Sequence, residues 1–271
     1  MVASKTVNET KEKLSDLGQE HVFNFYSKLS EAEQKTFLEQ VQSIDLNELK
    51  TQVDRLVLGN EKEADFNWDA LKPADYISLP ENGGDSALWE KAKSLGESVI
   101  KEGRVAAFTV AGGQGTRLGY DGPKGTFVVT PLSQKSLFEV FANKITRASE
   151  RYGVAIPWFI MTSAINHKTT IEAFEANNYF GMPKESLFFF SQALFPAVDL
   201  NGKILLEEKG KVVMTPNGHG GSLRALVDSG ATEKMRKEGI DVLSYFQVDN
   251  PLVSCIDPAF IGFHVLNQSE L

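Results

Sequence analysis

The residues of this chain best suited to chemistry lie in a glycine-rich stretch, Ala111 to Lys124, which follows the apolar run Val105–Val110. Glycines let a backbone approach an anion closely, and bare N–H groups in such a loop can bind phosphate oxygens. Two cations, Arg117 and Lys124, stand seven residues apart in this stretch. The combination predicts a site for a phosphate chain, whereas the glycines alone would be compatible with a simple strand-to-loop turn.

The spacing of these residues excludes two common phosphate loops. The Walker A pattern requires Gly-Lys followed by Ser or Thr, but here Lys124 follows Pro123 and precedes another glycine. The dinucleotide fingerprint G-x-G-x-x-G does not fit either, because Gly113, Gly115 and Gly119 are spaced one residue too widely. Pro123 would also break a helix that began near Gly115.

Polar residues follow the ends of other expected strands, where ligands of open α/β sheets bind. Gln192 offers a donor and an acceptor, which suits the edge of a nucleobase. The run from Asn217 to Gly221 presents bare backbone at Gly218, and its His219 is either a solvent-facing loop residue or part of a site. Asp249 either caps a turn or binds Mg²⁺, which is held by one or two carboxylates together with phosphate oxygens.

The elements that must position these residues change in character along the chain. Residues 1 to about 60 are predicted to be helical, with helix-start signals at Ser30 and Asp45. Residues 60–88 are predicted to be an irregular connector, and residues 87–102 are predicted to form a helix. Strands are then predicted at 105–110, 155–162, 187–191 and 242–248, with helices between them and a hairpin at Asn201-Gly202. The pattern predicts an α/β fold: a Rossmann-like, mostly parallel mixed sheet flanked by helices in 104–271, preceded by a helical region and connector in 1–103.

Composition limits the classes of function. The chain has 271 residues, 42% hydrophobic and 24% charged, with a net charge of −8. This charge argues against nucleic-acid or anionic-membrane partners, and no apolar run reaches the length of a membrane span. The N-terminus lacks the apolar core of a signal peptide, Cys255 is the single cysteine, and the four histidines form no metal motif. We therefore expect a cytoplasmic protein that is a monomer or weak oligomer.

Six motifs in order give the chain a family resemblance. They are the run from Gly112 to Gly119 with Pro123-Lys124, then residues 158–163, 179–181, 202–209, 216–221 and 248–250. Together they resemble the UDP-sugar pyrophosphorylase family, most closely the UDP-N-acetylglucosamine pyrophosphorylases. The resemblance implies a nucleotidyltransferase fold of the GT-A-like type and transfer of UMP from UTP to a sugar 1-phosphate, with release of pyrophosphate.

The resemblance also implies a role for each matching residue. The backbone from Gly112 through Gly113, Gly115 and Thr116 would hold the phosphates of UTP and lie near the uracil, and Arg117 and Lys124 would neutralise the triphosphate as the catalytic cations. Gln192 and the Gly218 backbone would read the uracil, and Asp249 would be the carboxylate of a Mg²⁺ or phosphate site. His219 and Asn250 would lie near the sugar phosphate.

Two departures from the family pattern bear on the substrate and on activity. His219 stands where the acetylglucosamine enzymes usually have Asn, whereas Gly221 follows their pattern and not the Asp of the glucose branch. N-acetylglucosamine 1-phosphate is the favoured substrate, and glucose 1-phosphate or broad sugar specificity is the alternative. The sugar pocket and a further phosphate-binding lysine of the family lie downstream of Leu271, so we expect this chain alone to bind UTP with little catalysis. A non-catalytic nucleotide-binding module and a helical adaptor are the competing classes.

Overall fold

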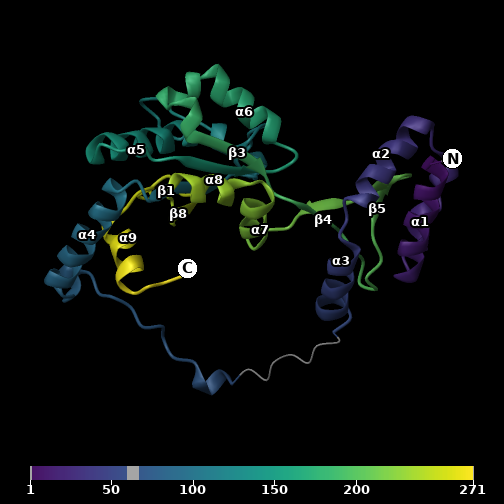
Figure 1. Cartoon of the computed structure of the whole chain (residues 1–271), viewed down its shortest axis with the longest axis horizontal. Coiled ribbons are helices and arrows are strands. Elements are labelled where there is room, and N and C mark those ends of the chain that lie inside the picture. The colour runs from purple at the N-terminus through teal and green to yellow at the C-terminus, as the bar shows by residue number, and fades with distance from the viewer. Residues whose placement is uncertain (1, 60–66, 271) are drawn as a thin grey trace. The chain divides into compact units, whose positions relative to one another are not determined.

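The computed structural model describes residues 2–59 and 67–270, which form two compact units, each built from two stretches of chain (Figure 1). One contains the described residues up to Ala74 together with Leu194–Pro216. The other contains Asp75–Ala193 and the described residues from Asn217 onward. Of the expected connector, residues 60–66 lie outside the described part of the chain. No helix in the described part is both long and apolar enough to cross a membrane.

The second unit is built on a four-stranded sheet in the order β3-β2-β1-β8. Its strands are β1 (Val105–Val110), β2 (Trp158–Thr162), β3 (Leu187–Ser191) and β8 (Val242–Gln247). Every pair is parallel. The predicted α/β class is confirmed. We expected one mixed sheet, but the main sheet is wholly parallel and the antiparallel pairs form two separate two-stranded sheets. The second strand begins at Trp158 and not at Ala155, in keeping with Pro157, which has no N–H to donate to a ladder.

Helices cover both faces of this sheet, as its alternating side chains require. Ala107 and Trp158 face a core built with α4 (Ser86–Lys101), α5 (Leu137–Tyr152), α6 (His167–Ala176) and α9 (Pro258–Leu266). Phe108 and Phe159 face the opposite core, which includes α7 (Gly221–Asp228) and α8 (Ala231–Glu238). Helix α8 was not predicted, because it buries only Ala231 and Met235 and has no extended apolar stripe.

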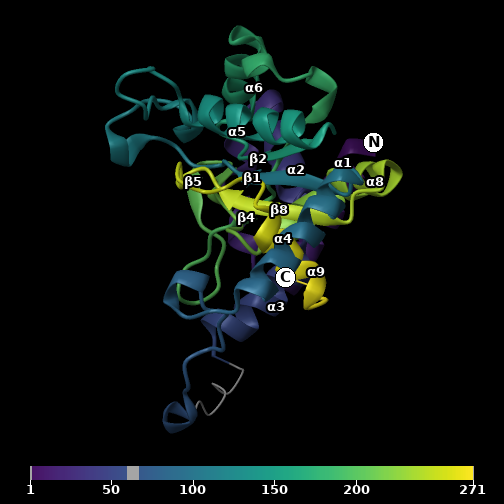
Figure 2. The ribbon, with the colours of Figure 1, turned by 90° about the vertical axis from the view of Figure 1, so that its left-hand side faces the viewer.

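Helices α4 and α9 lie side by side in both views (Figures 1 and 2). Glycines allow this close approach. A Cβ on Gly96 would lie 1.8 Å from the Pro258 carbonyl oxygen, and one on Gly262 would lie 1.7 Å from that of Ala92. Any larger residue at either position would force the two helices apart.

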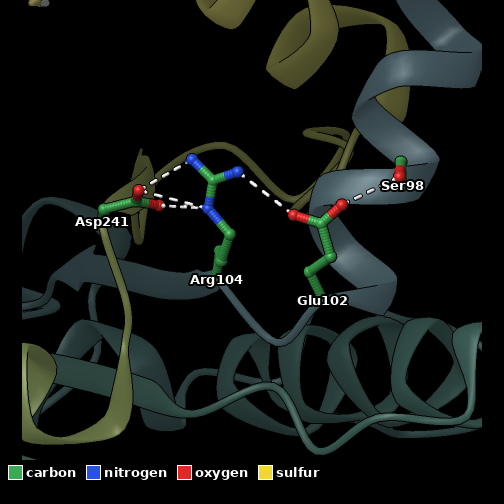
Figure 3. A network of polar contacts seen from close by, with 4 residues as sticks. All are labelled: Ser98, Glu102, Arg104 and Asp241. Carbon is green, nitrogen blue, oxygen red and sulfur yellow. Dashed lines mark hydrogen bonds and ion pairs between the residues drawn. The ribbon is translucent and has the colours of Figure 1, made fainter.

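A network of charges joins β1 and β8 at their amino ends (Figure 3). The Arg104 guanidinium donates from Nη2 to Asp241 at 2.7 Å and from Nη1 to Glu102 at 3.1 Å. These two carboxylates raise the pKa of Arg104, and Arg104 with Ser98 lowers the pKa of Glu102. The network lies at the edge of the sheet opposite the carboxyl ends of the strands, so it belongs to the scaffold.

The first unit packs helices α1 (Val2–Asp16), α2 (Glu31–Gln42) and α3 (Leu46–Gln52) against the chain segment 194–216. That segment carries the antiparallel pairs β4 (Leu194–Pro196) with β7 (Met214–Pro216), and β5 (Leu206–Glu208) with β6 (Lys211–Val212). The predicted helix starts are confirmed, since Ser30 forms a reciprocal cap with Glu33 and the Asp45 carboxylate accepts from Glu48 N–H.

Two glutamines attach segment 194–216 to the N-terminal helical region. Gln19 accepts from Ile204 N–H at 2.9 Å and donates to the Gly202 carbonyl at 2.8 Å. Gln40 does the same for Val212, with distances of 2.9 and 3.0 Å. Each amide thereby satisfies backbone groups of this segment, as a neighbouring strand would.

The units therefore differ from the predicted division at residue 103. Residues 75–103 group with the sheet because α4 packs into its core through Val99 and Ile100. Residues 194–216 group with the N-terminal helices, where Ile204 and Val212 complete the core. Such long-range pairings leave no local trace in the sequence.

Short helical turns complete the described chain. They are 3-10 turns at Glu20–Phe23, Tyr26–Lys28, Trp68–Ala70, Pro80–Asn82, Thr116–Leu118, Lys124–Thr126, Asn178–Gly181 and Lys184–Ser186, and a π turn at Val53–Val57.

Candidate active site

The strand order places the candidate site at a reversal in the sheet. From β1 the chain builds β2 and β3 on one side, and then returns to place β8 on the other side of β1. Ligands of open α/β sheets bind at such a point, beyond the carboxyl ends of the strands. The loop from Ala111 to Lys124 leaves β1 here, and Asp249 follows β8 by two residues.

The glycine-rich loop closes on itself through backbone hydrogen bonds. Gly115 N–H donates to the Gly122 carbonyl at 2.9 Å, and Lys124 N–H donates to the Gly113 carbonyl at 3.1 Å. Gly115 has no room for a side chain, because a Cβ would lie 2.6 Å from Cδ1 of Tyr120. The loop therefore has a defined shape that brings Lys124 back beside Gly113.

Lys124 and Asp249 form an ion pair across the carboxyl ends of β1 and β8. Lys124 Nζ lies 2.8 Å from Asp249 Oδ2, with side-chain exposures of 17% and 54%. The amine also lies 3.8 Å from the position that a Cβ on Gly113 would take. Three residues predicted from the sequence are thus brought together, with a cation and a carboxylate beside bare backbone.

Gln192 lies beside the same loop. Its N–H donates to the Thr162 carbonyl at 2.9 Å, and its side-chain amide carbon lies 3.5 Å from the position of a Cβ on Gly112. The residue is 7% exposed, yet its side-chain amide makes no hydrogen bond with any residue that the structure describes. A nearly buried amide without a protein partner is available to a ligand.

Other predicted site residues make no hydrogen bond or ion pair with Lys124 or Asp249 within the described chain. Arg117 is exposed on the turn that begins at Thr116, and its guanidinium has no ion pair or hydrogen bond with a described residue. His219 Nδ1 lies 2.7 Å from the hydroxyl of Tyr245, whose pKa is raised by partial burial. The exposed Gly218 has a φ of 72°.

Asn250 uses its side chain locally. Its Oδ1 accepts a hydrogen bond from Leu252 N–H at 3.2 Å, so it stabilises the turn after Asp249. Lys144 of α5 also holds this turn, by donating to the Pro251 carbonyl at 2.6 Å and to that of Val253 at 2.8 Å. Sequence reasoning missed Lys144, which is separated from its acceptors by more than 100 residues.

Sequence reasoning also missed Asn166, which is fully buried beneath the glycine-rich loop. Its Nδ2 donates to the Ala111 carbonyl at 3.0 Å and to the Gly113 carbonyl at 3.2 Å. Its position just beyond β2 was the available signal, because the end of each neighbouring strand borders the site.

The parallel α/β sheet, with a glycine-rich loop and a cation–carboxylate pair at its reversal point, is a fold of the nucleotidyltransferase type. A family model described as UTP–glucose-1-phosphate uridylyltransferase matches residues 46–271. The chain belongs to this family, which confirms the resemblance found in its sequence.

Individual relatives agree with this assignment. The chain is 38% identical over 258 residues to a probable UDP-N-acetylglucosamine pyrophosphorylase of Dictyostelium discoideum, covering 91% of this chain and 52% of the relative. It is 33% identical over 278 residues to the UDP-N-acetylglucosamine pyrophosphorylase of Saccharomyces cerevisiae, covering 98% and 57%. The crystal structure of the uridine diphosphate N-acetylglucosamine pyrophosphorylase of Trypanosoma brucei with an inhibitor matches with a TM-score of 0.80 and 29% identity, over 97% of this chain and 55% of that one. The chain spans about half the length of the curated relatives it matches.

Proposed function

We propose that this domain serves a uridylyltransferase that transfers UMP from UTP to a sugar 1-phosphate and releases pyrophosphate. The observation that carries the proposal is the Lys124–Asp249 pair beside the Gly113 backbone, at the reversal point of the sheet. The relatives named UDP-N-acetylglucosamine pyrophosphorylase favour N-acetylglucosamine 1-phosphate as the acceptor.

The proposed reaction requires little proton transfer. An anionic oxygen of the sugar phosphate attacks the α-phosphorus of UTP, and the bond from this phosphorus to the bridging oxygen breaks, so that pyrophosphate leaves with the electron pair. The attacking oxygen is already charged and needs no strong base. The protein's task is to align two polyanions and to stabilise negative charge on the α-phosphate and the leaving group.

The residues of the loop suit this task. The backbone from Gly112 to Thr116 would bind the triphosphate, with Lys124 donating charged hydrogen bonds that are worth roughly 1.5–3 kcal/mol each. The exposed Arg117 would close on the phosphates from the turn at Thr116. Gln192, with its unpaired amide, would bind the uracil edge together with the backbone of Gly218.

Magnesium fits this site only as an ion shared with phosphate. No cluster of three or more His, Cys, Asp or Glu side chains suited to a metal occurs in the described chain, so Asp249 would be a single protein carboxylate. One carboxylate completed by phosphate oxygens and water is a usual environment for Mg²⁺. When bound there, Mg²⁺ would neutralise phosphate charge, and Asp249 would hold it while Lys124 turned to the nucleotide.

Glucose 1-phosphate is the second candidate acceptor, because the matching family model carries the name of a glucose-1-phosphate enzyme. His219 and Asn250 would lie toward the sugar phosphate with either acceptor. Pyrophosphate release from UTP, measured with each sugar 1-phosphate in turn, distinguishes the two candidates.

Lys124→Ala tests the proposal directly. We expect UTP affinity and any turnover to fall by roughly 10- to 100-fold, because a charged donor is lost. Lys135→Ala is the matched control, since among the residues that the structure describes the Lys135 amine pairs only with Glu139, at 3.3 Å near the surface. Calorimetric titration with UTP and Mg²⁺ measures affinity, and circular dichroism confirms folding. A folded Lys124→Ala protein that binds and turns over UTP like the control would refute the proposed role.

We further propose a cytoplasmic location, which is supported by the single, buried Cys255. The monomeric or weakly associated state remains a prediction, and analytical ultracentrifugation would test it.

A further inference from the structure

We propose that Asn166 is a positioning residue that holds the glycine-rich loop in its phosphate-binding conformation. The inference rests on the proposed function, in which this loop binds UTP. Asn166 does not itself touch the substrate: it acts through the backbone of residues 111–113.

The first observation is that the Asn166 side chain does not cap the helix that it precedes. It is the N-cap residue of α6, where an Asn side chain normally accepts a hydrogen bond from the first turn and stabilises the helix by about 1 kcal/mol. Its side chain makes no such bond. An asparagine placed at a helix start but turned away from it indicates another role.

The second observation is where this side chain goes. It has no exposed surface, and both of its polar atoms are used. Nδ2 donates to the carbonyls of Ala111 and Gly113, at 3.0 and 3.2 Å. Oδ1 accepts from Ser163, from N–H at 2.8 Å and from Oγ at 3.0 Å. Asn166 therefore joins the end of β2 to the first residues of the loop.

These bonds orient the loop's N–H groups. In a trans peptide the carbonyl of one residue and the N–H of the next point in opposite directions, and the described chain has no cis peptides. Because the carbonyls of Ala111 and Gly113 point to Asn166, the N–H groups of Gly112 and Gln114 point away from it. Neither N–H donates to any residue that the structure describes. Asn166 thus turns two unpaired donors toward the side on which a phosphate can bind.

The chemistry of the side chain predicts which substitutions matter. Asn166→Asp preserves the shape and the acceptor for Ser163, but an ionised carboxylate cannot donate to either loop carbonyl. A protonated carboxyl regains one donor. The variant should therefore bind UTP weakly at neutral or higher pH and more tightly as the pH falls, whereas a loss of packing alone would not vary in this way.

The experiment compares Asn166→Asp with the wild-type chain and with Asn177→Asp. Asn177 follows the other end of α6 and donates from Nδ2 to the Ala173 carbonyl at 2.7 Å on the surface, so it controls for the same change of charge. Calorimetry gives UTP affinity between pH 5.5 and 8.5, and hydrogen exchange gives the protection of amides in 111–124. For Asn166→Asp we expect affinity at neutral pH to fall at least about tenfold and loop exchange to accelerate, roughly the effect of one or two lost hydrogen bonds. The control should match the wild type.

Ser163→Ala is the second variant, for the case in which Asn166→Asp fails to fold. It removes only the hydroxyl that orients Asn166 Oδ1, and should weaken UTP binding a few fold with the same acceleration of exchange. Wild-type affinity and loop protection in the folded variants would overturn the inference, as would an equal loss in Asn177→Asp. If the wild-type chain itself fails to bind UTP, the proposed function falls, and loop exchange alone then decides whether Asn166 holds the loop.

Discussion

Alanine substitutions at Gly113 and Gly115 should separate the binding role of the loop from its folding role. Both positions have backbone conformations outside the left-handed region, so alanine is not strained by φ at either one. Their surroundings differ. Among the described residues, a Cβ on Gly113 would meet only Lys124, at 3.7 Å from Cε and 3.8 Å from Nζ, which is ordinary contact. A Cβ on the buried Gly115 would lie 2.6 Å from Cδ1 of Tyr120 and 3.1 Å from its carbonyl oxygen.

The magnitudes follow from these distances. Replacing glycine by alanine lowers the entropy of the unfolded chain, which stabilises by about 0.4–1 kcal/mol where the site accepts a methyl group. Gly113→Ala should therefore be as stable as the wild type or slightly more so. Overpacking costs about 1–3 kcal/mol, so Gly115→Ala should lose about 1–2 kcal/mol net.

For UTP binding, the variant that leaves stability unchanged, Gly113→Ala, should show the direct loss. The methyl group of Gly113→Ala would stand beside the Lys124 amine on the backbone that we propose to bind the phosphates, and should weaken UTP binding about tenfold or more in a fully folded protein. Urea unfolding measures the stability of both variants, and titration with UTP measures their affinity. If Gly113→Ala binds UTP normally, or unfolds as easily as Gly115→Ala, the assignment of these two roles is wrong.

Three further predictions concern other groups of the sheet unit. Burial raises the pKa of Cys255 from its ordinary value of 9.0 to about 12, so the thiol is neutral below pH 9 in both folded and unfolded chains. Above pH 9 the Cys255 thiol ionises only in the unfolded chain, so the free energy of unfolding should fall by about 1.4 kcal/mol per pH unit up to pH 12. Chemical unfolding of Cys255→Ala should show no such fall from this thiol. Asp241→Asn removes the negative charge that pairs with Arg104 but keeps one acceptor oxygen. Because the pair is partly exposed, the loss of stability should stay below about 1 kcal/mol and shrink in 1 M salt; a larger loss, unchanged by salt, would contradict a screened pair. Tyr245→Phe removes the hydroxyl bonded to His219 and should raise the KM for the sugar 1-phosphate roughly 2- to 10-fold with UTP affinity unchanged; an altered UTP affinity would place His219 elsewhere.

Local sequence was sufficient to predict most of the sheet unit. The runs at Val105–Val110 and Leu187–Ser191 are strands with the predicted bounds, and α5 ends before Gly153 as expected. Buried parallel strands are continuous apolar runs, and a helix that ends at a left-handed glycine shows its end in the sequence. Helix α8 escaped prediction because it is only eight residues long and buries only Ala231 and Met235, so few apolar positions mark it in the sequence.

The sequence by itself determined the chemistry available to the site: bare backbone at Gly113 and Gly115, a cation at Lys124, a carboxylate at Asp249 and an amide at Gln192. These follow strands whose ends are recognisable from residue type alone. Only the tertiary structure decided that Lys124 and Asp249, which are 125 positions apart, meet at 2.8 Å, and that Asn166 turns from its helix to the loop. It also decided that residues 194–216 join the N-terminal helices. The physical reason is the same in each case: strand order and long-range hydrogen bonds arise from the packing of the whole chain, and local residue patterns do not encode them.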